Sequence, residues 1–315
     1  RGWGGERRSF AMPTCAAAAE GSGSVEELDL EIRYYRNAMR RGLAFIGRAG
    51  QAVEPPAPVR PPVPHPVARG AASASRSSKP LLRVLCLHGY VQNGEVFRQK
   101  TGSVRKAMKG CEFVFVDAPH SAEGAFPESE AKDFDAAGAS ANGGVGPRGW
   151  WHAGENSRRA AGEAWVRPAQ AYVCEGWAES LALLRTEAEE KGPFDCVFAF
   201  SQGCAMATAL LREAAAGSLR PLASARFAIL VGGFLPKDEA AATSLRGDGT
   251  PLRLSTLHVT GTEDQLVPRL RSEALAGLFE AERLTWLEHP GRHGVPTGTG
   301  AFKTALQQVI AQASE

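Results

Sequence analysis

Six short apolar runs, separated by helical patterns, constrain the fold of this 315-residue chain more than any other feature. Most of these runs lack a strict alternation of polar and apolar residues, which is typical of strands buried on both faces. Such strands, alternating with helices, form a parallel sheet that helices cover on both faces. The runs span residues 81–87, 112–117, 194–200, 226–232, 254–259 and 283–287. The sequence therefore predicts an α/β fold with a mostly parallel sheet of about six strands.

The predicted helices lie between these strands. We expect them at residues 94–108, from Pro168 to about residue 190, directly after Ser201, and at residues 267–281 and 301–313. Residues 118–166 are rich in Gly, Ala, Ser and Trp and are expected to be irregular. Right-handed crossovers bring the carboxyl ends of the strands to one edge, where such sheets bind their ligands.

Residues 1–80 differ in composition from the rest of the chain. They carry a net charge of +5, whereas the remaining residues carry −3. We expect a tail at residues 1–19, a basic amphipathic helix at about residues 24–49, and a spacer rich in Pro and Ser at residues 50–80. The predicted organisation is an N-terminal extension, helical in part and otherwise disordered, followed by one α/β domain at residues 81–315.

Composition argues against several functional classes. A net charge of +2, with 43% hydrophobic and 22% charged residues, favours neither nucleic-acid binding nor stable membrane insertion. The six cysteines form no C-x-x-C pair, so neither a zinc site nor a disulfide framework is indicated. Cys86 and Cys196 lie within apolar runs, as buried free thiols do. We expect a cytoplasmic protein, or a plastid or mitochondrial one if residues 1–19 belong to a transit peptide.

Ser201 stands at a sharp junction between an apolar run and a helix of small residues. Residues 199–203 read Ala-Phe-Ser-Gln-Gly and match the nucleophile-elbow pattern G-x-S-x-G at four of five positions. Small residues are needed two before and two after the serine, because strand and helix pack closely around this turn. Alanine at position 199 is the mildest departure, so Ser201 is the predicted nucleophile.

A nucleophilic serine needs a base, and the base needs an orienting acid. In this fold the acid and then the histidine follow the elbow in chain order. Asp264, after the fifth predicted strand, is the expected acid, with the neighbouring Glu263 as the alternative. A cap for the next helix is the purely structural reading of Asp264. His293, after the last predicted strand, is the expected base, and His289 competes with it.

Acyl transfer also needs hydrogen-bond donors for the oxyanion. The backbone N–H of Gln202 is one candidate, because it lies at a helix N-terminus where the dipole favours negative charge. The N–H of Tyr90, in the loop after the first strand, is the other. Gly89 lets this loop approach the substrate closely. His88 precedes the nucleophile, in the wrong chain order for the base, and is interpreted as a structural residue that orders the loop.

Trp150 and Trp151 stand together in the predicted irregular section. Paired indoles on a loop favour an apolar pocket for an acyl chain, to which Gly89 would also contribute. Equally, the pair would form a small hydrophobic cluster that pins the loop. The sequence leaves both interpretations open.

Taken in chain order, these residues resemble the FSH-type serine hydrolases, a family that includes the ovarian-tumour-candidate esterase and its fungal relatives. The resemblance covers about residues 81–312, and the shared pattern comprises residues 85–93, 116–120, 150–151, 200–203, 261–264, 267–268, 291–293 and 295–296. It implies a compact α/β-hydrolase that needs no cofactor and cleaves carboxylic esters, some members favouring long alkyl chains. It also implies that Ser201, Asp264 and His293 are the catalytic residues.

Two positions depart from the family pattern. Ala199 replaces the usual first glycine of the elbow, and Arg292 stands where a second glycine often precedes the histidine. The first departure bears on strain in the turn and the second on access to the base. Neither removes a catalytic atom.

The leading hypothesis is a serine hydrolase that cleaves small-molecule carboxylic esters, of medium to long chain, through an acyl-enzyme on Ser201. We expect no cofactor and no metal, and either a monomer or a homodimer. A thioesterase acting on lipidated proteins or acyl carriers is one alternative, because F-S-Q-G elbows also occur in acyl-protein thioesterases. A non-catalytic module that binds a small molecule on a hydrolase scaffold is the other.

Overall fold

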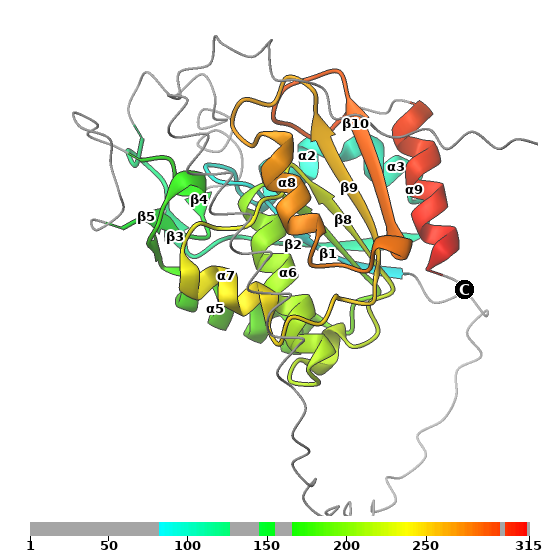
Figure 1. Cartoon of the computed structure of the whole chain (residues 1–315), viewed down its shortest axis with the longest axis horizontal. Coiled ribbons are helices and arrows are strands. Elements are labelled where there is room, and N and C mark those ends of the chain that lie inside the picture. Colours follow the sequence, from blue (N-terminus) through cyan, green and yellow to red (C-terminus); the bar gives the residue numbers. More distant parts are fainter. Residues whose placement is uncertain (1–81, 127–144, 155–165, 297–299, 314–315) are drawn as a thin grey trace, which may run out of the picture. The chain divides into compact units, whose positions relative to one another are not determined.

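The computed structural model describes residues 82–126, 145–154, 166–296 and 300–313 (Figure 1). The tail, the helix at about residues 24–49 and the spacer at residues 50–80 that the sequence predicts lie outside these residues. In the described part of the chain, no helix combines the length and the apolar character that a bilayer crossing requires. The five cysteines found there are free, and Cys86 and Cys196 are buried.

A six-stranded sheet forms the centre of the fold, and every neighbouring pair in it is parallel. Its strands, in the order β10-β9-β8-β7-β1-β2, are β1 (Leu82–Leu87), β2 (Cys111–Val116), β7 (Cys196–Phe200), β8 (Phe227–Val231), β9 (Ser255–Gly261) and β10 (Leu284–His289). The predicted α/β-hydrolase architecture is therefore confirmed, and each strand begins and ends within two residues of its predicted run.

The order of the strands reverses at β1. The chain runs from β1 outward to β2, then crosses back to form β7 on the other side of β1. The carboxyl ends of β1 and β7 therefore flank the point from which the chain continues in opposite directions. In open parallel sheets the crevice at such a point is where ligands bind.

Helices cover both faces of the sheet (Figure 1). On one face α2 (Gly94–Lys100), α3 (Gly102–Ala107) and α9 (Gly300–Gln312) bury an apolar core in which Phe198, Ile229 and Phe302 meet. On the other face lie α5 (Trp177–Lys191), α6 (Gln202–Ala215) and α8 (Arg269–Ala276), with α7 (Glu239–Arg246) packed on α6. The central strands β7 and β8 are thus buried throughout, as their apolar sequences predict, whereas the edge strands β2 and β10 are only partly buried.

The region between β2 and α5 differs from its prediction. It contains two short antiparallel ladders, β3 (His120–Ser121) with β4 (Arg148–Gly149), and β5 (His152–Ala153) with β6 (Cys174–Glu175). The prediction of a helix beginning at Pro168 is wrong, because Pro168–Gln170 forms only a 3₁₀ turn and α5 begins at Trp177. Gly176 separates the two with a φ of 91°, a left-handed conformation that a regular helix cannot contain.

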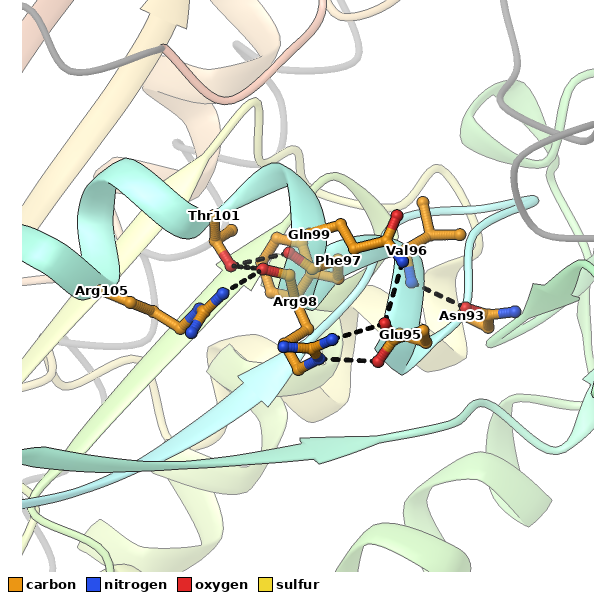
Figure 2. A network of polar contacts seen from close by, with 8 residues as sticks. All are labelled: Asn93, Glu95, Val96, Phe97, Arg98, Gln99, Thr101 and Arg105. Carbon is orange, nitrogen blue, oxygen red and sulfur yellow. Dashed lines mark hydrogen bonds and ion pairs between the residues drawn. The ribbon is translucent and has the colours of Figure 1, made fainter. Parts of the chain in front are cut away.

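The helix predicted at residues 94–108 is two helices, with a break at Thr101. Figure 2 shows the polar contacts around this break. The Thr101 hydroxyl donates to the carbonyl oxygen of Phe97 at 2.7 Å, and Arg105 donates to that of Arg98 at 2.9 Å. These side chains give two carbonyls in the last turn of α2 a hydrogen-bond partner. At the other end the Asn93 side chain accepts from a backbone N–H of the first turn.

Candidate active site

Ser201 occupies a strained turn between β7 and α6. Its φ of 52° and ψ of −119° are rare for a residue with a side chain and are typical of a functional turn. Its N–H donates to the carbonyl oxygen of Val231 at 2.9 Å, which fixes the turn against β8. A Cβ at Gly203 would lie 2.4 Å from the carbonyl oxygen of Leu87, so only glycine fits there. Ala199 is fully buried in β7, and Ser201 lies at the strand's carboxyl end.

His293, in the loop after β10, faces this serine. Its Nε2 lies 2.9 Å from the Ser201 Oγ. The imidazole packs against the Phe200 ring, with 4.9 Å between the centroids. On another side it contacts Gly232, where a Cβ would lie 2.7 Å from the His293 Cε1. Gly232 also has a φ of 57°, so both its space and its backbone conformation require glycine.

Asp264 holds the far side of the imidazole. Its Oδ2 lies 2.7 Å from the His293 Nδ1, and its side chain is only 1% exposed. Its other oxygen accepts from the backbone N–H groups of Leu266 at 3.0 Å and Val267 at 2.8 Å. The carboxylate is therefore fixed in orientation and accepts a hydrogen bond from the Nδ1–H of His293. This arrangement leaves the Nε2 lone pair to accept from the Ser201 hydroxyl.

The loops that carry the acid and the histidine form one unit. The N–H of Thr262 donates to the carbonyl oxygen of His289 at 2.9 Å, and the N–H of Glu263 to that of Gly291 at 3.0 Å. A Cβ at Gly261 would lie 2.3 Å from the same Gly291 oxygen. Backbone pairing thus continues past the ends of β9 and β10, and it places the two loops in contact.

The structure separates the competing side chains. It brings Asp264 to the imidazole, whereas Glu263 is exposed. It brings His293 to Ser201, whereas the His289 ring lies over Gly291, where a Cβ would be 2.9 Å from its Nδ1. Burial lowers the pKa of His289 from its usual value of 6.5.

The loop after β1 lies directly against the nucleophile. A Cβ at Gly89 would approach the Ser201 Cβ to 3.2 Å. The loop turns tightly, because the N–H of Gln92 donates to the Gly89 carbonyl oxygen at 3.2 Å, and Val91 adopts a φ of 66°. A positive φ is strained for a β-branched residue. Two hydrogen bonds of 2.8 Å to the backbone of Arg148 hold the strained turn against β4.

His88 orders this loop, as the sequence predicts. It is completely buried. Its Nε2 accepts from the N–H of Ala118 at 3.0 Å, and its Nδ1 donates to the carbonyl oxygen of Gly89 at 2.7 Å. Both ring nitrogens are therefore occupied by the backbone. Burial lowers its pKa to about 4, so the ring is neutral near neutral pH.

The side chain of Gln202 has a role that sequence reasoning missed. Its Oε1 accepts from the N–H of Trp150 at 2.9 Å, and its Nε2 donates to the carbonyl oxygen of Trp151 at 2.9 Å. Both indoles are fully buried, and their N–H groups donate to the carbonyl oxygens of His88 and Pro168. The tryptophan pair thus pins its segment to the elbow. Its contribution to an acyl pocket stays a prediction.

Metal ligands do not cluster in the residues that the structure describes: no group of three or more His, Cys, Asp or Glu side chains there is arranged to hold a metal ion. A serine, a histidine and an aspartate meet in a single hydrogen-bonded chain at the carboxyl edge of the sheet.

A serine hydrolase family, described as serine hydrolase (FSH1), matches residues 77–305 of this sequence. The chain belongs to this family. The match begins near the predicted domain boundary, contains every residue of the site, and confirms the resemblance seen in the sequence motifs.

Three named esterases are similar to this chain over most of its length. The human esterase OVCA2 is 37% identical over 218 residues, which are 68% of this chain and 89% of that protein. The Caenorhabditis elegans esterase C25G4.2 is 36% identical over 225 residues, or 70% of this chain and 89% of that protein. The Drosophila melanogaster esterase CG5412 is 34% identical over 260 residues, or 77% of this chain and 84% of that protein.

Proposed function

We propose that this serine hydrolase is a carboxylesterase that forms an acyl-enzyme on Ser201. The observation that carries the proposal is the continuous chain from Asp264 through His293 to Ser201, with hydrogen bonds of 2.7 and 2.9 Å. This chain ends on a serine in a strained strand-to-helix turn, which is the arrangement that activates a hydroxyl for attack on a carbonyl carbon. The esterase names of the relatives support the same reaction class.

In the proposed mechanism the Ser201 Oγ attacks the ester carbonyl while the His293 Nε2 takes its proton. Asp264 accepts a hydrogen bond from the Nδ1–H and stabilises the imidazolium that forms. The imidazolium then protonates the leaving alcohol. Water, activated by the same imidazole, hydrolyses the acyl-enzyme and returns Ser201 to its starting state.

The oxyanion is assigned to two backbone N–H groups, those of Gln202 and Tyr90. Gln202 is the first residue of α6, so its N–H lies in the helix turn where the dipole favours negative charge. Tyr90 lies between Gly89 and Val91, in the tight turn that touches the nucleophile. Hydrogen bonds to the backbone of Arg148 hold that turn, which supports its role as a preorganised donor.

The proposed substrate is a small-molecule carboxylic ester with a medium to long chain. The reaction needs only the side chains and backbone groups named above, together with water. A series of p-nitrophenyl esters of increasing chain length measures the preference directly. Comparing oxygen esters and thiol esters of equal chain length decides between an esterase and a thioesterase.

A fluorophosphonate probe tests the nucleophile. We expect it to label the wild-type protein, to fail with Ser201→Ala, and to react at least about 10³-fold more slowly with His293→Ala. Ser218→Ala is the matched control, because this exposed serine on another segment donates only to a helix carbonyl. Labelling that persists in folded Ser201→Ala, or a folded wild type that takes up no label and turns over no ester, contradicts the proposal.

A further inference from the structure

The side chain of Tyr90 is held as firmly as its backbone. Its hydroxyl lies 3.1 Å from the His152 Nδ1, and the two rings meet edge to face with 5.7 Å between their centroids. The Tyr90 ring also packs on Gly149, where a Cβ would lie 2.7 Å from two of its carbons. Only glycine at position 149 leaves space for this placement of the ring.

Trp151, the residue next to His152, contacts Gln202, whose backbone N–H is the other proposed oxyanion donor. The carbonyl oxygen of Trp151 accepts from the Gln202 side chain at 2.9 Å. One short segment, residues 150–152, therefore contacts both residues whose backbone N–H groups are assigned to the oxyanion. The backbone of Trp150 and Trp151 bonds to the side-chain amide of Gln202. The His152 imidazole bonds to the Tyr90 hydroxyl.

We propose that His152 is a positioning residue for the oxyanion hole. Its imidazole holds the Tyr90 hydroxyl, and through the rigid tyrosine it fixes the backbone N–H of Tyr90 relative to that of Gln202. The inference rests on the proposed function, because it assigns a role in the same acyl-transfer site. His152 does not touch the nucleophile's hydrogen-bonded chain and acts only through Tyr90.

The surroundings of His152 determine which group donates in its hydrogen bond with Tyr90. Burial lowers the pKa of His152 from its usual 6.5, and the nearby His120, 6.1 Å away between ring centroids, lowers it further. A hydrogen bond to the backbone of Ser121 and the charge of Glu175, its partner across the β5–β6 ladder, act in the opposite direction. With one ring nitrogen donating to Ser121, a neutral His152 accepts at Nδ1 from the Tyr90 hydroxyl.

Steady-state kinetics on a p-nitrophenyl ester test the inference. Tyr90→Phe removes the hydroxyl and keeps the backbone, and His152→Leu removes the acceptor. We expect each variant to lower kcat about tenfold, a fraction of the roughly 10²–10³ caused by losing an oxyanion donor, with KM within about twofold. Rates are expressed per active site titrated with the fluorophosphonate, so that a misfolded fraction does not lower kcat.

Three further variants give the inference its specificity. The double variant Tyr90→Phe/His152→Leu should be no slower than either single variant, because both remove the same contact. His152→Asn, which keeps an oxygen acceptor near the place of Nδ1, should recover part of the rate. Tyr172→Phe, which removes a tyrosine hydroxyl elsewhere, should match the wild type.

An alkyl trifluoromethyl ketone gives a direct readout of the oxyanion hole, because its adduct with Ser201 carries a negative oxygen. We expect Tyr90→Phe and His152→Leu each to bind it about tenfold more weakly. Wild-type kcat and ketone affinity in Tyr90→Phe, or losses that multiply in the double variant, overturn the inference while the esterase proposal stands. A wild type without Ser201-dependent labelling or turnover instead overturns the proposed function, and the inference with it.

Discussion

Individual glycines and small residues decide whether the three side chains of the site can meet. Gly203 lies against the backbone of β1, Gly232 lies against the imidazole of His293, and Gly261 lies against the loop that carries the histidine. At each position an added methyl group would overlap a neighbouring atom. The three side chains of the site can therefore meet only because these neighbouring positions carry no Cβ atom.

Gly232→Ala should separate the base from the nucleophile. The new Cβ would lie 2.7 Å from the His293 Cε1, so the imidazole must move, and a displacement of about 1 Å costs roughly 10² in rate. Ester turnover and fluorophosphonate labelling measure the effect. Gly217→Ala is the matched control: its φ of 78° imposes a similar backbone strain, but nothing lies within 4 Å of the new carbon. Equal losses in the two variants would show that strain, and not contact with the histidine, is responsible.

Ala199→Gly should leave the elbow active. Ala199 lies within the buried strand, in register with Leu87 and Leu230, and the strain of the turn falls on Ser201. We expect kcat/KM within about twofold of the wild type, with unfolding easier by about 0.5–1 kcal/mol because glycine is more flexible in the unfolded chain. Kinetics and urea denaturation measure the two quantities. A large loss of activity would mean that the Ala199 methyl group itself supports the turn.

At the scale of elements, the sequence predicts what is local. Apolar runs predicted all six strands of the main sheet, and the pattern is plainest in β7 and β8, which are buried on both faces. Pro168 signalled a helix start, yet Gly176 and the ladder to His152 delay the helix to Trp177. The start of α5 depends on contacts with residues far away in the chain, and no local pattern reports these.

In the site, too, local sequence features were predictable and contacts between distant residues were not. Chain order and motif spacing predicted Ser201, Asp264 and His293, because each follows a strand and all strands end at one edge. The clamp that Gln202 forms on residues 150 and 151 was not predictable, since its partners lie about 50 residues away in an irregular section. A glutamine directly after the nucleophile is the only sequence signal for it, and this signal does not name the partner.

Two helix caps of similar construction should differ in their effect on activity. Asn93 caps α2 and also donates to the carbonyl oxygen of Gly146, while Asp238 caps α7 and also accepts from the N–H of Cys174. Replacing either with Ala should lower the free energy of unfolding by about 1–2 kcal/mol. Only Asn93→Ala should also lower kcat, because Asn93 ends the loop that carries Tyr90. Denaturation and steady-state kinetics on both variants test this, and equal kcat values would contradict it.

At the scale of the whole molecule, buried histidines link stability to pH. His258 is buried on β9 between the rings of Trp286 and Phe279, and burial lowers its pKa from 6.5 to about 3. His88 adds to the effect, since burial lowers its pKa to about 4. In the unfolded chain both rings take up a proton below pH 6.5, whereas in the folded protein they stay neutral. These two histidines therefore cost the folded state no stability above pH 6.5, and they cost it more as the pH decreases towards their folded-state pKa values.

Replacing His258 should flatten this dependence. Between pH 7.5 and pH 5.0 the wild type should lose about 2 kcal/mol of unfolding free energy through His258 alone, at about 1.4 kcal/mol per pH unit below 6.5. His258→Leu removes the proton uptake at this position in the unfolded state. Its unfolding free energy should therefore fall by about 2 kcal/mol less than that of the wild type between the two pH values. Urea denaturation of both proteins at the two pH values measures the difference. Parallel losses in the two proteins would assign the acid sensitivity to other groups.

The separation of the nucleophile from its base along the chain has a consequence during synthesis. Ser201 and His293 are 92 residues apart, and the histidine follows the last strand of the sheet. At roughly 5–20 residues per second, a ribosome takes roughly 5 to 20 s to translate from one to the other. Throughout this interval the nascent chain has the serine without the base, and until Asp264 is translated it also lacks the acid. Under the proposed mechanism the nascent chain is therefore inactive. Ester cleavage begins only after β10 and the histidine that follows it have left the ribosome and β10 has joined the sheet.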